Sequence, residues 1–151
     1  MANISLVKPD KSMYSMAIDC VVEYLKNKEL KVFGGSFIES LSYSDWLDII
    51  TSVYFIFDEE SLIGFAEFKD LNTLNVSVDF SLKPSMRNNS IYSSVIEELL
   101  KMGTELGCSS LSIYFSMADV SLFDYVKVNS IYATSLHLSD TDVACFNLQL
   151  S

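Results

Sequence analysis

The chain has 151 residues, of which 50% are hydrophobic and 20% are charged, and this size and composition suffice to bury one substantial core. We therefore expect residues 1–151 to form a single domain. Twenty acidic residues against ten basic ones give a formal net charge of −10. This charge disfavours nucleic acid and anionic membranes as partners and favours amine-bearing or cationic ones.

The N-terminus and the cysteines show no sign of export. The chain begins Met-Ala-Asn-Ile-Ser-Leu, without the charged-then-apolar order of a signal peptide, and no apolar run approaches the ~20 residues that span a bilayer. Cys20, Cys108 and Cys145 are odd in number and scattered, which argues against a disulfide framework or a zinc site. We expect a cytoplasmic protein with reduced thiols and no bound metal.

The first half of the chain is predicted to mix strands and helices. Residues 4–7 form a short strand, and residues 11–28 form a helix with one apolar face. A second helical region covers residues 37–50, with a new helix start at Ser42 as one alternative. Residues 53–57 and 62–68 then form a hairpin around a polar turn.

The segment from residue 74 to residue 115 predicts a strand, a loop, a helix and a second strand in uninterrupted order. Apolar residues fall on every second position of residues 74–82, and Pro84 ends that strand. Helical spacing follows over residues 90–106, with Gly107 as the expected left-handed C-cap, and residues 111–115 return to a strand. The loop feeds a helix N-terminus, whose free N–H groups attract anions.

The last part of the chain predicts a helix over residues 120–128 and a closing hairpin of residues 131–138 and 143–150. His137, the only histidine, lies within this hairpin. It has no neighbouring pattern of Ser, Cys or carboxylate residues, so a packing role is favoured over a catalytic triad or a metal site.

From the end of the strand at residues 74–82 the chain reads Phe80-Ser81-Leu82-Lys83-Pro84-Ser85-Met86-Arg87-Asn88-Asn89-Ser90-Ile91-Tyr92. This segment resembles the GCN5-related N-acetyltransferases, in which a strand ending in a basic or polar residue and Pro precedes an Arg/Gln-x-x-Gly-x-Gly/Ala loop and a helix. The resemblance implies an α/β fold with a mixed, mainly antiparallel sheet of about seven strands and helices on both faces. Further motifs fall in the order typical of a bacterial subgroup, namely Trp46-Leu47, Leu62-Ile63-Gly64-Phe65 and Leu71-Asn72.

The same resemblance implies acetyl-CoA as the cofactor. The pantetheine arm would pair with the main chain of Phe80, Ser81 and Leu82. The phosphates would lie over the loop and first helical turn formed by Arg87, Asn88, Asn89, Ser90, Ile91 and Tyr92.

Ser90 and Tyr92 stand at the two positions that the family gives to glycine or alanine, where a bare backbone approaches the pyrophosphate. Asn88 and Asn89 can adopt left-handed conformations and donate hydrogen bonds, so an altered anion site is one interpretation. The alternative is a binding protein that kept the fold and lost the pyrophosphate site, and Tyr92 is its main argument.

The catalytic hypothesis is acetyl transfer to a primary amine of a small molecule or peptide, by direct attack in a ternary complex. Glu67 and Asp79 are the carboxylates best placed on strands to accept the amine proton, although both could simply face solvent. The family suggests a tyrosine as acid for the thiolate, and Tyr125 lies one residue from that position, so packing is its alternative role. Gly34-Gly35 would border the acceptor pocket or simply end a helix. A homodimer is left open.

Overall fold

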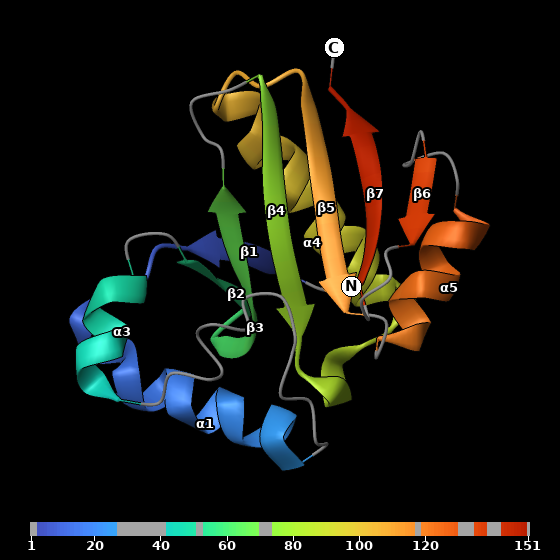
Figure 1. Cartoon of the computed structure of the whole chain (residues 1–151). Coiled ribbons are helices and arrows are strands. Elements are labelled where there is room, and N and C mark those ends of the chain that lie inside the picture. Colours follow the sequence, from blue (N-terminus) through green and yellow to red (C-terminus); the bar gives the residue numbers. More distant parts are fainter. Residues whose placement is uncertain are drawn as a thin grey trace.

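The computed structural model describes residues 3–26, 42–50, 53–69, 74–116, 119–129, 135–138 and 143–150. Both helices and strands occur along this chain (Figure 1). The elements are β1 (Ile4–Val7), η1 (Lys11–Met13), α1 (Tyr14–Lys26), α3 (Tyr43–Ile49), β2 (Val53–Asp58), β3 (Ser61–Lys69), β4 (Asn75–Leu82), η2 (Pro84–Met86), α4 (Asn89–Glu105), β5 (Ser110–Ser116), α5 (Val120–Val128), β6 (Ser135–Leu138) and β7 (Val143–Gln149), where η marks a short 3-10 helix.

The boundaries follow the sequence periodicity closely. The strand at residues 4–7 and the helix at residues 120–128 begin and end as predicted. Of the other ends within the described residues, those at 11, 53, 82, 138 and 143 also agree and the rest differ by one residue, whereas 27–28, 37–41 and 131–134 fall outside the described residues. The first helix begins with a 3-10 turn, capped by the Asp10 side chain. The predicted helix start at Ser42 agrees with α3, because the Trp46 N–H donates to the Ser42 carbonyl over 3.1 Å.

The strands form one seven-stranded sheet in the order β1-β2-β3-β4-β5-β7-β6. Every neighbouring pair is antiparallel except β4 and β5, which are parallel. A parallel pair requires a crossover connection, and α4 supplies it between these two strands. The expected mixed, mainly antiparallel sheet is confirmed.

Helices cover both faces of the sheet, as expected (Figure 1). Side chains of a strand point alternately to its two faces, and β2 divides its residues accordingly. Val53, Phe55 and Phe57 belong to a core with α1 and α3, which buries Trp46 completely. Ile56 belongs to a second core with α4 and α5. We call these two sides of the sheet the α1 face and the α4 face.

Two glycines have clear structural reasons. Gly107 ends α4 with a φ of 75°, the left-handed conformation that the sequence predicted for its C-cap. Gly64 of β3 lies so close to β4 that a Cβ atom there would be 2.2 Å from the Ser81 carbonyl oxygen. The close approach of β3 and β4 at this point therefore depends on the absence of a side chain at Gly64.

Candidate functional site

The ladder between β4 and β5 ends before the strands do. It runs from Asn75 opposite Ser110 to Asp79 opposite Tyr114, whereas β5 continues to pair with β7 as far as Ser116. Residues 80–82 of β4 therefore lie beyond the last residue that pairs with β5. We call this part of the sheet the β4–β5 fork, and the Asp79–Tyr114 pair its apex.

The backbone of β4 presents polar groups to the fork. The Lys83 N–H donates to the Ile63 carbonyl over 2.8 Å, and backbone groups of an antiparallel pair face the partner strand at every second residue. The N–H and C=O of Ser81 consequently face β3, and those of Phe80 and Leu82 face the fork. The side chains of Phe80 and Leu82 are fully buried in the core of the α4 face.

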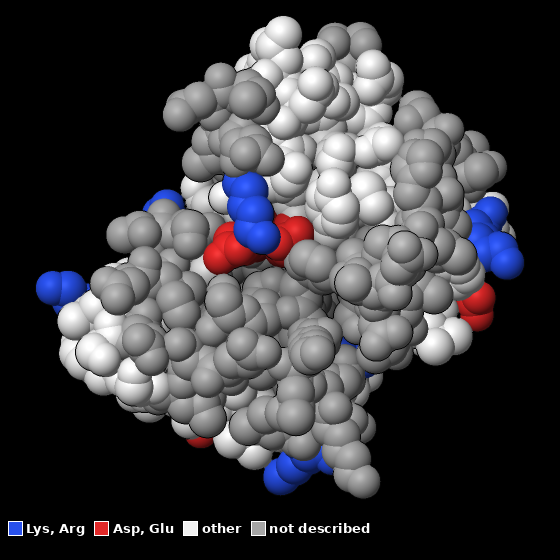
Figure 2. All heavy atoms as spheres, in the orientation of Figure 1, with Lys and Arg blue, Asp and Glu red and all other residues white. Residues whose placement is uncertain are grey.

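Both predicted carboxylates lie on the α1 face, Asp79 as part of the apex and Glu67 directly beside it. Glu67 of β3 pairs directly with Asp79 of β4, so their side chains project from the same side of the sheet. Lys69, two residues beyond Glu67, places its Nζ 2.5 Å from Asp79 Oδ2 and 3.5 Å from Glu67 Oε1. Figure 2 shows a group of acidic side chains with a basic side chain over them in the middle of the molecular face. Lys69 was not among the predicted site residues.

Burial changes the proton affinity of this group. It raises the pKa of the Asp79 carboxyl above its usual range, while the hydrogen bond and positive charge of Lys69 act to lower it. The pKa of Lys69 is raised, first by its hydrogen bond with Asp79, and partial burial opposes this. Asp79 is therefore a stronger base than an exposed aspartate, and it already contacts an ammonium group.

The register extends this row of polar residues beyond Asp79. Tyr114 of β5 lies opposite Asp79, Cys145 of β7 lies opposite Tyr114, and His137 of β6 occupies the register position opposite Cys145. Burial raises the pKa of Cys145, a hydrogen bond with Tyr114 lowers it, and the negative charge of Asp79 raises it. Tyr114 and Cys145 could not be found as site residues from the sequence, because only the strand pairing brings them to Asp79.

The loop before α4 leads into a helix N-terminus with exposed polar residues. Asn88 is the N-cap, and its Oδ1 accepts from the Ile91 N–H over 3.1 Å. Asn89 and Ser90 are exposed in the first turn, whereas Ile91 and Tyr92 are buried. The first N–H groups of a helix have no intrahelical partner, so this end of α4 is electrostatically positive.

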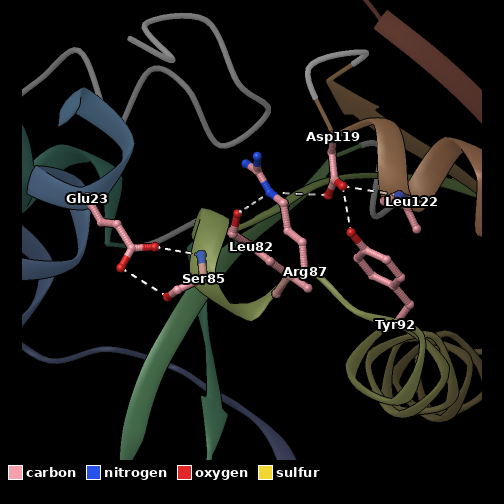
Figure 3. Close-up of polar contacts among 7 residues, drawn as sticks. All are labelled: Glu23, Leu82, Ser85, Arg87, Tyr92, Asp119 and Leu122. Carbon is pink, nitrogen blue, oxygen red and sulfur yellow. Dashed lines mark hydrogen bonds and ion pairs between the residues drawn. The ribbon is translucent and has the colours of Figure 1, made fainter. Parts of the chain in front are cut away.

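The Tyr92 ring points into the protein, away from the exposed first turn. It is fully buried and lies 5.7 Å from the Tyr125 ring. Its hydroxyl donates to Asp119 Oδ1 over 2.6 Å (Figure 3). Burial, followed by the hydrogen bond to Asp119, raises the Tyr92 pKa, so the hydroxyl stays protonated. The Tyr92 side chain therefore packs in the core of the α4 face.

Asp119 connects three elements around this tyrosine. Besides Tyr92, its Oδ1 accepts from the Leu122 N–H over 3.1 Å, which caps α5. Its Oδ2 lies 3.4 Å from Arg87 Nε, and that Nε also donates to the Leu82 carbonyl over 2.9 Å (Figure 3). Arg87, the predicted phosphate ligand, is thus held against the end of β4 with its charge partly balanced by a buried carboxylate.

Tyr125, the predicted acid, lies on α5 and is 7% exposed. Its ring packs against Tyr92, as the alternative packing role would require. It also lines an open pocket of about 270 Å³ next to the α4 N-terminus, together with Asn89, Ser121, Asp124, Val128 and Asn129.

The η2 turn is tied to α1 on the other side of the loop. Glu23 of α1 accepts from the Ser85 N–H over 2.8 Å and from the Ser85 hydroxyl over 3.0 Å (Figure 3). The remaining predicted elements of the acceptor side, including Gly34-Gly35, lie outside the described residues.

The described ranges contain neither a cluster of metal ligands nor a helix that could cross a membrane. No group of three or more His, Cys, Asp or Glu residues there has a metal-binding arrangement. Every helix in those ranges is too short or too polar to cross a bilayer. Cys20 and Cys108 are buried free thiols, and burial raises the pKa of Cys20 to about 12.

The fold is similar to that of solved acetyltransferases over nearly its whole length. An acetyltransferase from Salmonella typhimurium that modifies the N-terminal serine of a ribosomal protein superposes with a TM-score of 0.71 at 12% identity, covering 100% of this chain and 97% of that chain. The PaiA N-acetyltransferase from Thermoplasma acidophilum, in complex with coenzyme A, gives 0.68 at 18% identity, with 97% and 99% covered. A microcin self-immunity acetyltransferase in complex with acetyl-CoA and AMP gives 0.70 at 12% identity, with 97% and 92% covered. Neither a protein-family model nor a curated sequence matches the chain.

Proposed function

The chain has the fold of the GCN5-related N-acetyltransferases, and from this we propose that it transfers an acetyl group from acetyl-CoA to a primary amine. The observation that carries the proposal is the β4–β5 fork, whose backbone groups at Phe80 and Leu82 face away from β3. An extended cofactor arm with amide groups can pair with such a strand edge.

The pyrophosphate and the thioester of the cofactor would lie at two different parts of the site, the α4 N-terminus and the apex. The pyrophosphate would lie at the N-terminus of α4, near Asn89 and Ser90, where backbone N–H groups and the helix dipole favour anions. The pantetheine arm would run along residues 80–82 of β4 towards the apex. The thioester would then face Asp79 and Tyr114, the last residues that pair across the two strands.

The acceptor amine would approach the thioester from the α1 face. Glu67 and Asp79 lie there, and a pair of carboxylates favours a cationic amine of a small molecule or a peptide. Asp79 or Glu67 would accept the amine proton, directly or through water, before the amine attacks the thioester in a ternary complex. Burial raises the Asp79 pKa, so Asp79 accepts a proton more readily than an exposed aspartate, as this proton transfer requires.

Two tyrosines are candidates for protonating the departing thiolate. Tyr114 lies at the apex opposite Asp79, whereas Tyr125 packs against Tyr92 beside the α4 N-terminus. We expect Tyr114→Phe to lower kcat about 100-fold, the usual loss when a general acid is removed, and Tyr125→Phe to leave more activity. Thiol-release kinetics with acetyl-CoA and an alkyl amine measure both. A larger loss for Tyr125→Phe would return the assignment to Tyr125.

A second candidate function is binding without catalysis, by a protein that lost the pyrophosphate site. The observation that favours it is the pairing of Arg87 with Asp119, since the carboxylate reduces the positive field that a phosphate would experience.

Calorimetric titration with acetyl-CoA separates the two candidates. We expect the native protein to bind it, and Arg87→Gln to bind it about 10- to 100-fold more weakly, because a charge-assisted contact contributes roughly 1.5–3 kcal/mol. Lys101→Gln is the matched control, since Lys101 is a basic residue on the exposed side of α4 that pairs with Glu98. Absence of binding by the native protein would favour the second candidate.

A further inference from the structure

The lysine at the apex has the position of an acyl acceptor. Lys69 Nζ lies 2.5 Å from Asp79, and Asp79 is the last β4 residue that pairs with β5. The primary amine of Lys69 therefore touches the carboxylate that would take the proton from an external amine. The Lys69 side chain is 50% exposed, so its amine has room to move towards a bound thioester.

We propose that Lys69 is itself acetylated by acetyl-CoA bound in the fork, so that the protein modifies its own apex. The inference rests on the proposed function, because it requires the cofactor to bind with its thioester near Asp79. Other described lysines have different surroundings. Lys101 Nζ also contacts a carboxylate, Glu98 Oε1 at 3.1 Å, but it lies on the exposed side of α4 with its side chain 69% exposed.

The chemical step needs no reactant besides acetyl-CoA. The Lys69 ammonium gives one proton to the Asp79 carboxylate, and the nitrogen lone pair then attacks the carbonyl carbon of the thioester. The N–C bond forms, the C–S bond breaks, and the thiolate of coenzyme A takes the second proton that the attacking nitrogen loses. Asp79 then releases its proton to solvent. The products are acetylated Lys69, coenzyme A as a thiol, and one proton.

Buried Asp79 suits the first proton transfer. Burial raises its pKa, so it holds a proton more readily than an exposed aspartate would. The same contact raises the pKa of Lys69, so the transfer is uphill in the resting ion pair and is completed by attack on the thioester. The contact that now forms an ion pair provides the path for that proton. Acetylation would remove the positive charge of Lys69 and leave Glu67 and Asp79 facing one another without it. The modified apex would be more negative, and would attract an external ammonium group more strongly.

The test follows acetylation of individual lysines in the intact native protein. Purified protein is incubated with acetyl-CoA, and peptide mass spectrometry measures the acetylated fraction of Lys69 and Lys101 over time. We expect Lys69 to react at least about tenfold faster than Lys101, because the bound thioester is held next to it. Excess coenzyme A should slow the reaction of Lys69 and leave that of Lys101 unchanged.

Two variants test the role of the carboxylates. Asp79→Asn should slow acetylation of Lys69 to the rate of Lys101, whereas Glu98→Gln, which removes the carboxylate that contacts Lys101, should leave the rate of Lys69 unchanged. If Asp79→Asn does not fold, the comparison of Lys69 with Lys101 in the native protein decides alone. Equal rates at both lysines, with acetyl-CoA binding seen by calorimetry, would overturn this inference and leave the proposed function intact. Absence of binding would overturn both.

Discussion

Replacing Asp119 with alanine is expected to lower the free energy of unfolding by about 3–5 kcal/mol, the usual cost of removing one partner from a buried ion pair. The Asp119 side chain is 5% exposed and that of Arg87 is 10% exposed. The substitution also leaves the buried Tyr92 hydroxyl without its acceptor and removes the cap of α5. Chemical denaturation, followed by circular dichroism and tryptophan fluorescence, measures the change.

Asp119→Asn is the matched control for this prediction. Its amide oxygen can still accept from the Tyr92 hydroxyl and the Leu122 N–H, while the negative charge beside Arg87 is removed. We expect it to lose less stability than Asp119→Ala. It should also bind coenzyme A more tightly, since a carboxylate beside Arg87 no longer opposes the phosphates. Equal stability of Asp119→Ala and the native protein would show that this residue does not hold the α4 and α5 ends together.

Gly64→Ala is expected to be the most damaging single methyl addition in the described sheet. The new Cβ would lie 2.2 Å from the Ser81 carbonyl oxygen and 3.0 Å from Leu82 Cα, both backbone atoms. A backbone clash can be relieved only by separating β3 from β4, so we expect a loss of about 3 kcal/mol or more in the free energy of unfolding. Because residues 80–82 would move, coenzyme A binding should weaken in any variant that still folds.

Two other glycines serve as controls. At Gly103 the nearest atom to an added Cβ is Leu150 Cδ1 at 2.8 Å, a flexible side-chain end, and the helix gains propensity. At Gly107 the surroundings are open, but the φ of 75° costs an alanine about 1–2 kcal/mol. Thermal unfolding of the three variants should therefore place Gly64→Ala lowest. A Tm for Gly64→Ala above that of Gly107→Ala would contradict the clash.

Local periodicity was sufficient to predict most of the described elements. Residues 74–82 alternate apolar and polar side chains, and β4 forms there with the expected faces. The helix over residues 90–106 and its glycine cap follow from spacing and from glycine conformation, which are local properties. Such signals need no knowledge of the partners of an element.

The chemistry of the apex depends on strand pairing, which the sequence does not display. Glu67 and Asp79 were selected as carboxylates on strands, but their direct pairing depends on the register of β3 against β4. Lys69 could have been found, because residues i and i+2 of a strand share a face and Glu67 precedes it by two positions. Tyr114 joins the apex only through the parallel pairing of β4 with β5.

The orientation of the Tyr92 ring could not be predicted from the sequence, for a similar reason. A tyrosine at a family glycine position suggests an obstructed phosphate site when only the loop is considered. The side chain instead turns inward, because Asp119, from a distant part of the chain, accepts its hydrogen bond and Tyr125 packs on its ring. The motif identified the position, and the tertiary partners determined where the ring lies.

The two hydrogen bonds between Glu23 and Ser85 have a consequence for how events on the two sides of the loop are linked. They join α1, a helix of the α1 face, to the turn that precedes the proposed phosphate site. A ligand that moves this turn would change these two hydrogen bonds, each of which contributes about 1 kcal/mol to stability. Linkage is reciprocal, so any change in cofactor affinity caused by a molecule bound against α1 would be matched by an equal change in the affinity for that molecule. Glu23 would be one link between a molecule bound against α1 and the cofactor.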